Sequence, residues 1–156
     1  FLAAGDWALD RMVNAGCDGL LITDLPVGAD PPLESRFTAS PLAFIRLVAP
    51  TTPVDRMKLI AQNGSGFVYL ISRLGVTGMQ QQIAPELGST VARLRSVTTL
   101  PICVGFGVTD ARQAAAVAAV ADGVVVGSAI VRAAGTSVDA AIALTRSLRA
   151  GIDNAG

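Results

Sequence analysis

Short runs of apolar residues recur along the chain, separated by stretches whose apolar residues follow helical spacing. Nearly continuous apolar runs of this length are typical of strands in a parallel sheet that is covered on both faces. We predict strands over residues 18–24, 44–48, 66–72, 100–105 and 122–127. The stretches around them predict helices over residues 6–15, 53–62, 85–96, 109–120 and 137–150.

Capping and breaking residues refine these helices. Thr52 precedes a proline and is expected to cap the second helix, and Thr109 or Asp110 is expected to cap the fourth. Gly151 is expected to end the last helix. The segment 26–41 holds four prolines, which predicts a short or distorted helix there.

A helix followed by repeated strand–helix units predicts one α/β domain over residues 1–156. Such a series closes either as an open doubly wound sheet or as a (β/α)₈ TIM barrel. The dinucleotide-binding fingerprint that favours the open sheet is incomplete, since Gly105-Phe106-Gly107 lacks the third glycine. The pattern alone leaves both closures open.

Composition narrows the possible partners. Lys plus Arg and Asp plus Glu number 12 each, so the formal net charge is zero. A neutral chain has no field to attract nucleic acid or an anionic membrane, and we expect neither as a partner. No apolar run approaches the ~18 residues that a membrane span needs.

The chain has no histidine, which excludes histidine-based metal sites and Ser-His triads from this segment. We therefore expect no metal site.

Cys17 and Cys103 lie at or beside apolar runs. They are predicted to be buried free thiols in a reducing compartment, in agreement with a cytoplasmic location.

Glycines follow the last two predicted strands. Gly105-Phe106-Gly107 ends one strand, and Gly127-Ser128 ends the next and leads into a short predicted helix. Phosphate-binding barrels hold phosphate on these two loops and on a short helix, where free N–H groups and the helix dipole attract an anion. The alternative is that these glycines only make tight turns.

The loop after residue 72 is long and contains Gly75, Thr77 and Gly78, which is typical of a lid, although a disordered insertion gives the same pattern. Tyr69, in the preceding strand, faces either the core or a substrate.

Asp24 at the first strand end is either a catalytic-type carboxylate or a turn residue. No second carboxylate is near it in sequence to complete an acid/base pair.

Several blocks of the sequence resemble the tryptophan synthase alpha subunit family. The most specific are Ala-Pro-Thr-Thr-Pro, Gly-Val-Thr-Gly and Val-Gly-Ser-Ala, and the order and spacing of the blocks fit along the chain. The blocks are residues 18–26, 47–53, 66–72, 75–78, 104–108 and 122–130.

The resemblance implies a partial (β/α)₈ TIM barrel of the phosphate-binding type, with this chain supplying about strands four to eight. It implies a lyase that cleaves indole-3-glycerol phosphate to indole and glyceraldehyde 3-phosphate in tryptophan biosynthesis. It also implies a beta subunit as partner, in an alpha2beta2 heterotetramer. The alpha chain itself is expected to use no cofactor, and pyridoxal phosphate is expected only in the beta subunit.

The resemblance also assigns residues. The phosphate-binding positions of the family match Gly78, Phe106, Gly107, Gly127 and Ser128. Tyr69 matches a supporting tyrosine that lines the substrate pocket. Thr77 matches a supporting threonine of the lid, which docks against a catalytic aspartate when the lid closes. Asp24 and Pro26 match a stretch near the beta-subunit face.

The catalytic glutamate and aspartate of the family are expected upstream of Phe1, so that the isolated segment is expected to be inactive. Two other functions remain open from the sequence. The chain could be another phosphate-binding barrel enzyme, or a non-catalytic half-barrel that only binds.

A five-stranded part of a barrel leaves both sheet edges unpaired, so we predict that the isolated chain is only marginally stable. Urea denaturation followed by circular dichroism tests this. A single steep transition at high denaturant would contradict the prediction.

Overall fold

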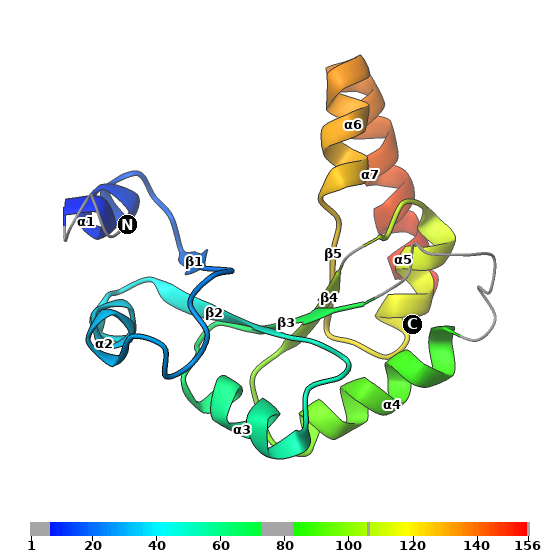
Figure 1. Cartoon of the computed structure of the whole chain (residues 1–156). Helices are drawn as coiled ribbons and strands as arrows, with labels where there is room; N and C mark the ends of the chain where they lie inside the picture. The colour runs from blue at the N-terminus through cyan, green and yellow to red at the C-terminus, as the bar shows by residue number, and fades with distance from the viewer. Residues whose placement is uncertain (1–6, 73–82, 106, 156) are drawn as a thin grey trace.

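The computed structural model describes residues 7–72, 83–105 and 107–155. Five parallel strands form one sheet in which the spatial order equals the chain order, β1-β2-β3-β4-β5 (Figure 1). The strands are β1 (Gly19–Leu21), β2 (Ala43–Val48), β3 (Val68–Ile71), β4 (Ile102–Gly105) and β5 (Gly123–Val125). Each connection between strands contains a helix, as parallel pairing requires.

The helices lie along the sheet in chain order. They are α1 (Trp7–Asn14), α2 (Pro31–Ala39), α3 (Val54–Gln62), α4 (Ile83–Arg95), α5 (Ala111–Ala118), α6 (Ser128–Thr136) and α7 (Val138–Asp153). Figure 1 shows α3 and α4 beneath the sheet, and α6 and α7 as a helical hairpin that projects beyond it. Helix α7 packs against both α5 and α6.

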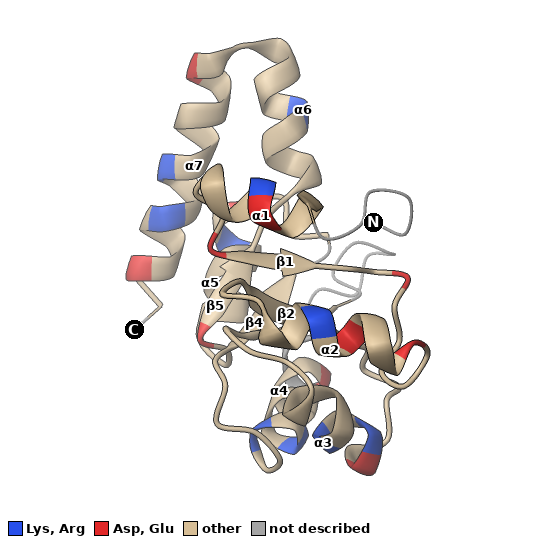
Figure 2. Cartoon of the chain, turned by 90° about the vertical axis from the view of Figure 1, so that its left-hand side faces the viewer, with Lys and Arg blue, Asp and Glu red and all other residues tan. Residues whose placement is uncertain are grey.

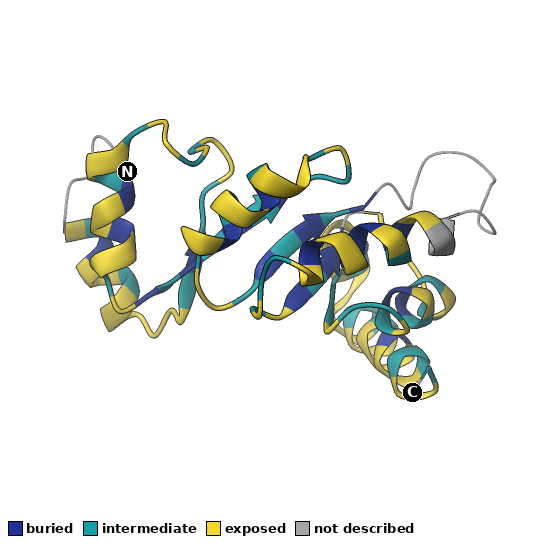
Figure 3. Cartoon of the chain, turned by 90° about the horizontal axis from the view of Figure 1, so that it is seen from below, coloured by how far each residue is buried: buried dark blue, intermediate teal, exposed yellow. Residues whose placement is uncertain are grey.

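The two faces of the sheet differ in burial. Along β2 and β3, residues alternate between buried and half-buried, as expected for strands with one covered face. The buried side chains, such as Val48, Val68 and Leu70, face the helices, whereas Ile45 and Tyr69 occupy the half-buried positions. Figure 3 shows the strands in the buried and intermediate colours and the outer helix surfaces in the exposed colour.

The buried apolar residues form two clusters on the helix side. The smaller cluster joins α1, β1, α2 and β2 through Leu9, Leu20, Phe37, Leu42 and Phe44. The larger cluster joins β2, β3 and β4 to helices α3, α4, α5 and α7. Strand β2 contributes to both, with Phe44 in the first and Val48 in the second, and Arg46 is buried between them.

The predicted strands and helices are confirmed, with ends that differ by a few residues. Among the strands, the one predicted over 18–24 has the largest error in length, since β1 covers only Gly19–Leu21. Within the helix predicted over 85–96, the apolar residues at helical spacing, Leu87, Val91 and Leu94, are buried. The short helix predicted after Gly127 is α6.

The short or distorted helix predicted in the proline-rich segment 26–41 is confirmed as a short helix that is not distorted. The segment contains α2, a nine-residue helix without a break. Its first two residues are Pro31 and Pro32, and prolines are tolerated there because first-turn N–H groups have no helical partner. The Asp30 side chain caps the helix by accepting from the Leu33 amide (3.0 Å).

Three local predictions are wrong. The Thr52 hydroxyl accepts from the Ala49 amide (3.1 Å) in a turn, and α3 has no side-chain cap. Gly151 does not end α7, which continues to Asp153. The helical spacing of apolar residues in the stretch 137–150 indicated a buried face, but two of these residues, Val138 and Ile142, are exposed.

The cysteine prediction is wrong about burial, although both thiols are free. Cys17 is exposed because it follows α1 in a turn where Gly16 has a positive φ of 82°. Cys103 is half-buried and lies opposite Gly123, which has no side chain to cover it.

The close packing of α7 on α5 predicts the effect of one glycine substitution. A Cβ on Gly151 would collide with the backbone carbonyl of Ala111, which cannot move without shifting α5. We expect Gly151→Ala to lower the free energy of unfolding by ~1–3 kcal/mol, because overpacking outweighs the gain in helix propensity. Urea denaturation of the purified chain measures it.

The matched control is Gly135→Ala in α6, where an added Cβ meets nothing within 4 Å. This variant is expected to be neutral or stabilised by up to ~1 kcal/mol. Equal effects of the two substitutions would show that backbone contact at Gly151 does not limit the packing of α7.

Asp122 links the start of β4 to the start of β5 and predicts a pH dependence. Its carboxylate accepts from the Ile102 amide (2.8 Å) and from Arg95 (2.9 Å). The Ile102 hydrogen bond, and then Arg95, hold the pKa of the Asp122 carboxyl below its usual value. A depressed pKa adds stability above the unfolded-state value of about 3.9, and this contribution is lost as the pH falls through the folded-state value.

We therefore expect Asp122→Asn to be less stable than the parent chain at neutral pH, with the difference shrinking as the pH falls below about 4. Arg95→Met should have a smaller effect, since the Ile102 amide remains. Thermal unfolding across pH measures both, and a pH-independent difference for Asp122→Asn would contradict the linkage.

Candidate functional site

The carboxyl ends of the strands meet at one edge of the sheet. Ile71, Gly105 and Val125 are register partners across β3, β4 and β5, so the three loops that follow begin side by side. At the end of β3, the Ser72 amide and hydroxyl both donate to the Gly105 carbonyl, at 2.8 and 3.0 Å. This bond ties the start of one loop to the end of the next strand.

The loop after β4 needs a glycine. Gly107 has a φ of 89°, which residues with a Cβ rarely adopt, and it is exposed. The α5 helix that follows is capped, because the Asp110 carboxylate accepts from the Gln113 amide (2.9 Å) and the Gln113 side chain accepts from the Thr109 amide (2.7 Å). The Gln113 amide, in the first turn of α5, is therefore already bound by a side chain.

The loop after β5 differs in this respect. Gly127 is the N-cap of α6, and no side chain caps this helix. Gly127 and Ser128 are exposed, and a Cβ at Gly127 would meet nothing within 4 Å. The first amides of α6 are thus open to an external acceptor, and the positive end of the helix dipole favours an anion there. Of the two predicted phosphate-binding turns, this one leads into a helix without a side-chain cap.

Tyr69 lies on the half-buried face of β3. Its hydroxyl packs against Gly105, where an added Cβ would collide with it and would come within 2.8 Å of the Val125 carbonyl. Burial raises the pKa of the Tyr69 phenol, so the side chain is a neutral hydrogen-bonding group at physiological pH. Glycine at position 105 leaves the space for this hydroxyl beside the strand ends.

Asp24 and Pro26 lie in the loop between β1 and α2, and both are exposed. Asp24 is three residues beyond the end of β1, so it belongs to the loop and not to the strand as predicted. The predicted residues Thr77, Gly78 and Phe106 lie outside the described residues. The structure therefore brings Tyr69, Gly107, Gly127 and Ser128 to one edge of the sheet.

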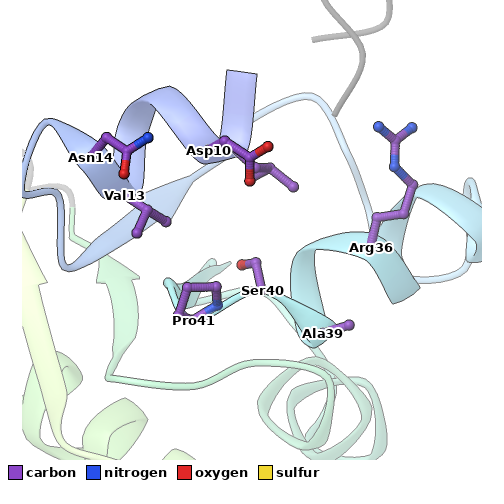
Figure 4. Close-up of a pocket in the computed structure, with 8 residues that line it drawn as sticks. Asp10, Val13, Asn14, Arg36, Ala39, Ser40 and Pro41 are labelled. Atoms are coloured by element: carbon purple, nitrogen blue, oxygen red, sulfur yellow. The ribbon is translucent and has the colours of Figure 1, made fainter. Parts of the chain in front are cut away.

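A hollow of about 540 Å³ lies at the ends of β2 and β3, beside the first turns of α4. It is lined by residues 49–51, Ile71, Ser72 and four residues of α4, and Gly107 and Gly127 do not line it. A second hollow, of about 590 Å³, lies between α1 and α2 (Figure 4). It includes Ser40 and Pro41, which precede β2, and so lies toward the opposite edge of the sheet.

Charged residues are scattered over the helices, as Figure 2 shows. Within the described ranges, no group of three or more Cys, Asp or Glu side chains is placed to hold a metal ion. None of the helices in these ranges is long and apolar enough to span a bilayer.

Sequence reasoning missed the buried ion pair between Glu34 and Arg46, whose nearest atoms are 2.5 Å apart. The signal was present, since Arg46 is the one charged residue in the strand 44–48. An arginine at a buried strand position requires a buried acceptor, and a glutamate on the neighbouring helix satisfies this need.

Residues 2–153 match the model of the tryptophan synthase alpha chain family. The tryptophan synthase alpha chain of Desulfatibacillum aliphaticivorans is 52% identical over 132 residues, which cover 85% of this chain and 50% of that protein. The alpha chain of Novosphingobium aromaticivorans is 44% identical over 126 residues, covering 81% of this chain and 47% of that protein. The chain thus spans about half the length of the curated relatives it matches.

Solved structures of tryptophan synthase also match this chain. A tryptophan synthase structure from M. tuberculosis matches with a TM-score of 0.83 and 34% identity, covering 97% of this chain and 57% of that one. Tryptophan synthase subunit alpha from Campylobacter jejuni matches with a TM-score of 0.82 and 29% identity, covering 91% of this chain and 58% of that one.

These matches decide between the two closures that the pattern left open. The five parallel strands, in chain order, are part of a (β/α)₈ barrel, as predicted, and not of a doubly wound sheet. The family match, the identities and the fold lead to one conclusion: this chain belongs to the tryptophan synthase alpha chain family.

Proposed function

We propose that the chain is part of a lyase that cleaves indole-3-glycerol phosphate to indole and glyceraldehyde 3-phosphate in tryptophan biosynthesis. Within that enzyme, this chain supplies the phosphate-binding part of the site. The observation that carries the proposal is the uncapped start of α6, at the carboxyl edge of the sheet, in a chain of this family.

The phosphate would accept hydrogen bonds from the first amides of α6, beginning at Gly127 and Ser128. Gly107 supports this assignment because its positive φ holds the neighbouring loop in a conformation that only glycine adopts readily. We assign Phe106 and Gly78 to the same phosphate site by their match to the family's positions. This binding would hold one end of the substrate and direct its carbon chain toward the half-buried face of the sheet, where Tyr69 lies.

Tyr69 would line the pocket for the rest of the substrate, as a neutral phenol on the half-buried face of β3. Thr77 would belong to a lid that excludes water. The proton-shuttling glutamate and the aspartate that polarises the indole nitrogen are assigned to a portion of the enzyme upstream of Phe1. The reaction is proposed to need no cofactor or metal in the alpha chain.

We further propose a cytoplasmic alpha2beta2 assembly with a beta subunit, which carries pyridoxal phosphate. The M. tuberculosis relatives support a partner, because they are structures of tryptophan synthase, whereas the Campylobacter jejuni relative is a structure of subunit alpha. Asp24 and Pro26 are assigned to the partner-facing loop, and their exposure supports this.

The coding DNA upstream of Phe1 provides the first test. We expect an open reading frame that continues for about a hundred codons and supplies a glutamate and an aspartate at strand ends. The protein with that segment should release indole from indole-3-glycerol phosphate. A start codon just before Phe1 would overturn the lyase proposal and favour a half-barrel that only binds.

A charge reversal tests the phosphate site. Ser128→Asp puts a carboxylate at the start of α6. The helix dipole stabilises this carboxylate, but its negative charge repels phosphate. We expect the affinity for indole-3-glycerol phosphate to fall by at least about tenfold, or ~1.4 kcal/mol, without loss of thermal stability. Isothermal titration calorimetry measures the affinity.

The matched control is Ser137→Asp, the same change at the start of α7. Ser137 caps its helix by accepting from the Ala140 amide (3.0 Å), and aspartate caps equally well. This variant should bind as the parent does. Equal losses in both variants would assign the effect to net charge and count against a phosphate site on α6.

A further inference from the structure

The loop between β1 and α2, residues 22–30, is anchored by charged side chains from other elements. Arg46, on β2, is 4% exposed and donates from Nη1 to the Leu25 carbonyl (3.0 Å). Its Nη2 donates to Glu34 (2.5 Å) and its Nε to the carbonyl of Asn63 (2.9 Å), the C-cap of α3. The guanidinium also lies 3.8 Å from the centroid of the Phe44 ring.

Two more contacts hold the same loop. The second carboxylate oxygen of Glu34 accepts from the Gly28 amide (2.7 Å), at a position where φ is 87°. Arg56, on α3, donates to the Val27 carbonyl (2.9 Å). Successive backbone groups at Leu25, Val27 and Gly28 are therefore each bound by a charged side chain.

The anchored and exposed residues alternate. Leu25 and Val27 are half-buried, whereas Asp24 and Pro26, next to them, are exposed. Fixing the carbonyls of Leu25 and Val27 fixes the backbone on both sides of Pro26. The exposed residues are thus presented from a backbone with little freedom to rearrange.

A buried ion pair is costly to desolvate, and an apolar pair of similar volume often stabilises a core as well. The two apolar clusters on either side of Arg46 already supply hydrophobic contact across β2. The pair differs from an apolar substitute because its fixed donors and acceptors select one loop conformation. Its distinctive contribution is therefore geometric.

We propose that Arg46 and Glu34 are positioning residues that hold the Asp24–Pro26 segment in the conformation that binds the partner subunit. The proposal rests on the proposed function for the identity of that partner, the beta subunit. The role assigned to these two residues rests only on their contacts with the loop.

Hydrogen exchange tests the positioning directly. In Arg46→Met, which keeps the apolar stem but loses every donor, we expect the Gly28 amide to exchange at least about tenfold faster than in the parent. The Val104 amide, in β4, a strand paired on both sides, should change much less. Equal acceleration at Gly28 and Val104 would mean that Arg46 acts only on global stability, and would overturn the proposal.

Met57→Ala is the matched control, because Met57 is fully buried in the larger cluster and its apolar side chain is not one of the charged groups that bind the loop. It should lower global stability while leaving Gly28 protected relative to Val104. Arg46→Lys keeps the charge but cannot reach Leu25, Glu34 and Asn63 together, so it should restore Gly28 protection only in part.

Binding completes the test in the full-length protein. Arg46→Met should bind the beta subunit about tenfold more weakly, or by ~1.4 kcal/mol, with unchanged indole release by the alpha subunit alone. Unchanged binding together with lost Gly28 protection would overturn the partner-positioning role. A parent protein that does not bind the beta subunit at all would instead overturn the proposed partner, while the exchange result still decides whether Arg46 holds the loop.

Discussion

The parallel pairing of the strands in chain order is the constraint on which the rest of this structure depends. Parallel neighbours cannot be joined by tight turns, so each connection carries a helix and all carboxyl ends fall on one edge. That edge collects Gly107, Gly127 and Tyr69 from separate parts of the sequence. The same pairing leaves the second face of the sheet half-buried, because the helices that the chain provides lie on the first.

Hydrophobic periodicity predicted the element order and the type of sheet, because buried parallel strands and amphipathic helices leave distinct patterns. The prediction failed where one type of residue, proline or glycine, has two possible structural roles. Prolines start α2 where the sequence predicted a short or distorted helix, and Gly151 allows close contact with Ala111 where the sequence predicted a stop. Choosing between such roles requires knowing which backbone lies opposite, and that information is tertiary.

The candidate site also has a part that the sequence predicted and a part that it did not. The glycines at 107 and 127 could be identified from sequence because turn glycines after strands have a known relation to anions. The difference between a capped α5 and an uncapped α6 could not, because Asp110 and Gln113 close one helix start by side-chain geometry. The Arg46–Glu34 pair was also missed, since pairing across 12 residues depends on how α2 lies on β2. Charge within an apolar strand was the only available clue.

The division of the core into two clusters has a consequence for optical spectroscopy. The chain contains one tryptophan and one tyrosine. Trp7 is 54% exposed on α1, beside the smaller cluster, with Arg11 5.2 Å from its ring. Tyr69 lies in β3, among strands of the larger cluster. Tryptophan fluorescence therefore reports on the amino-terminal part of the sheet alone, and its agreement with circular dichroism measures how far the two clusters unfold as one cooperative unit.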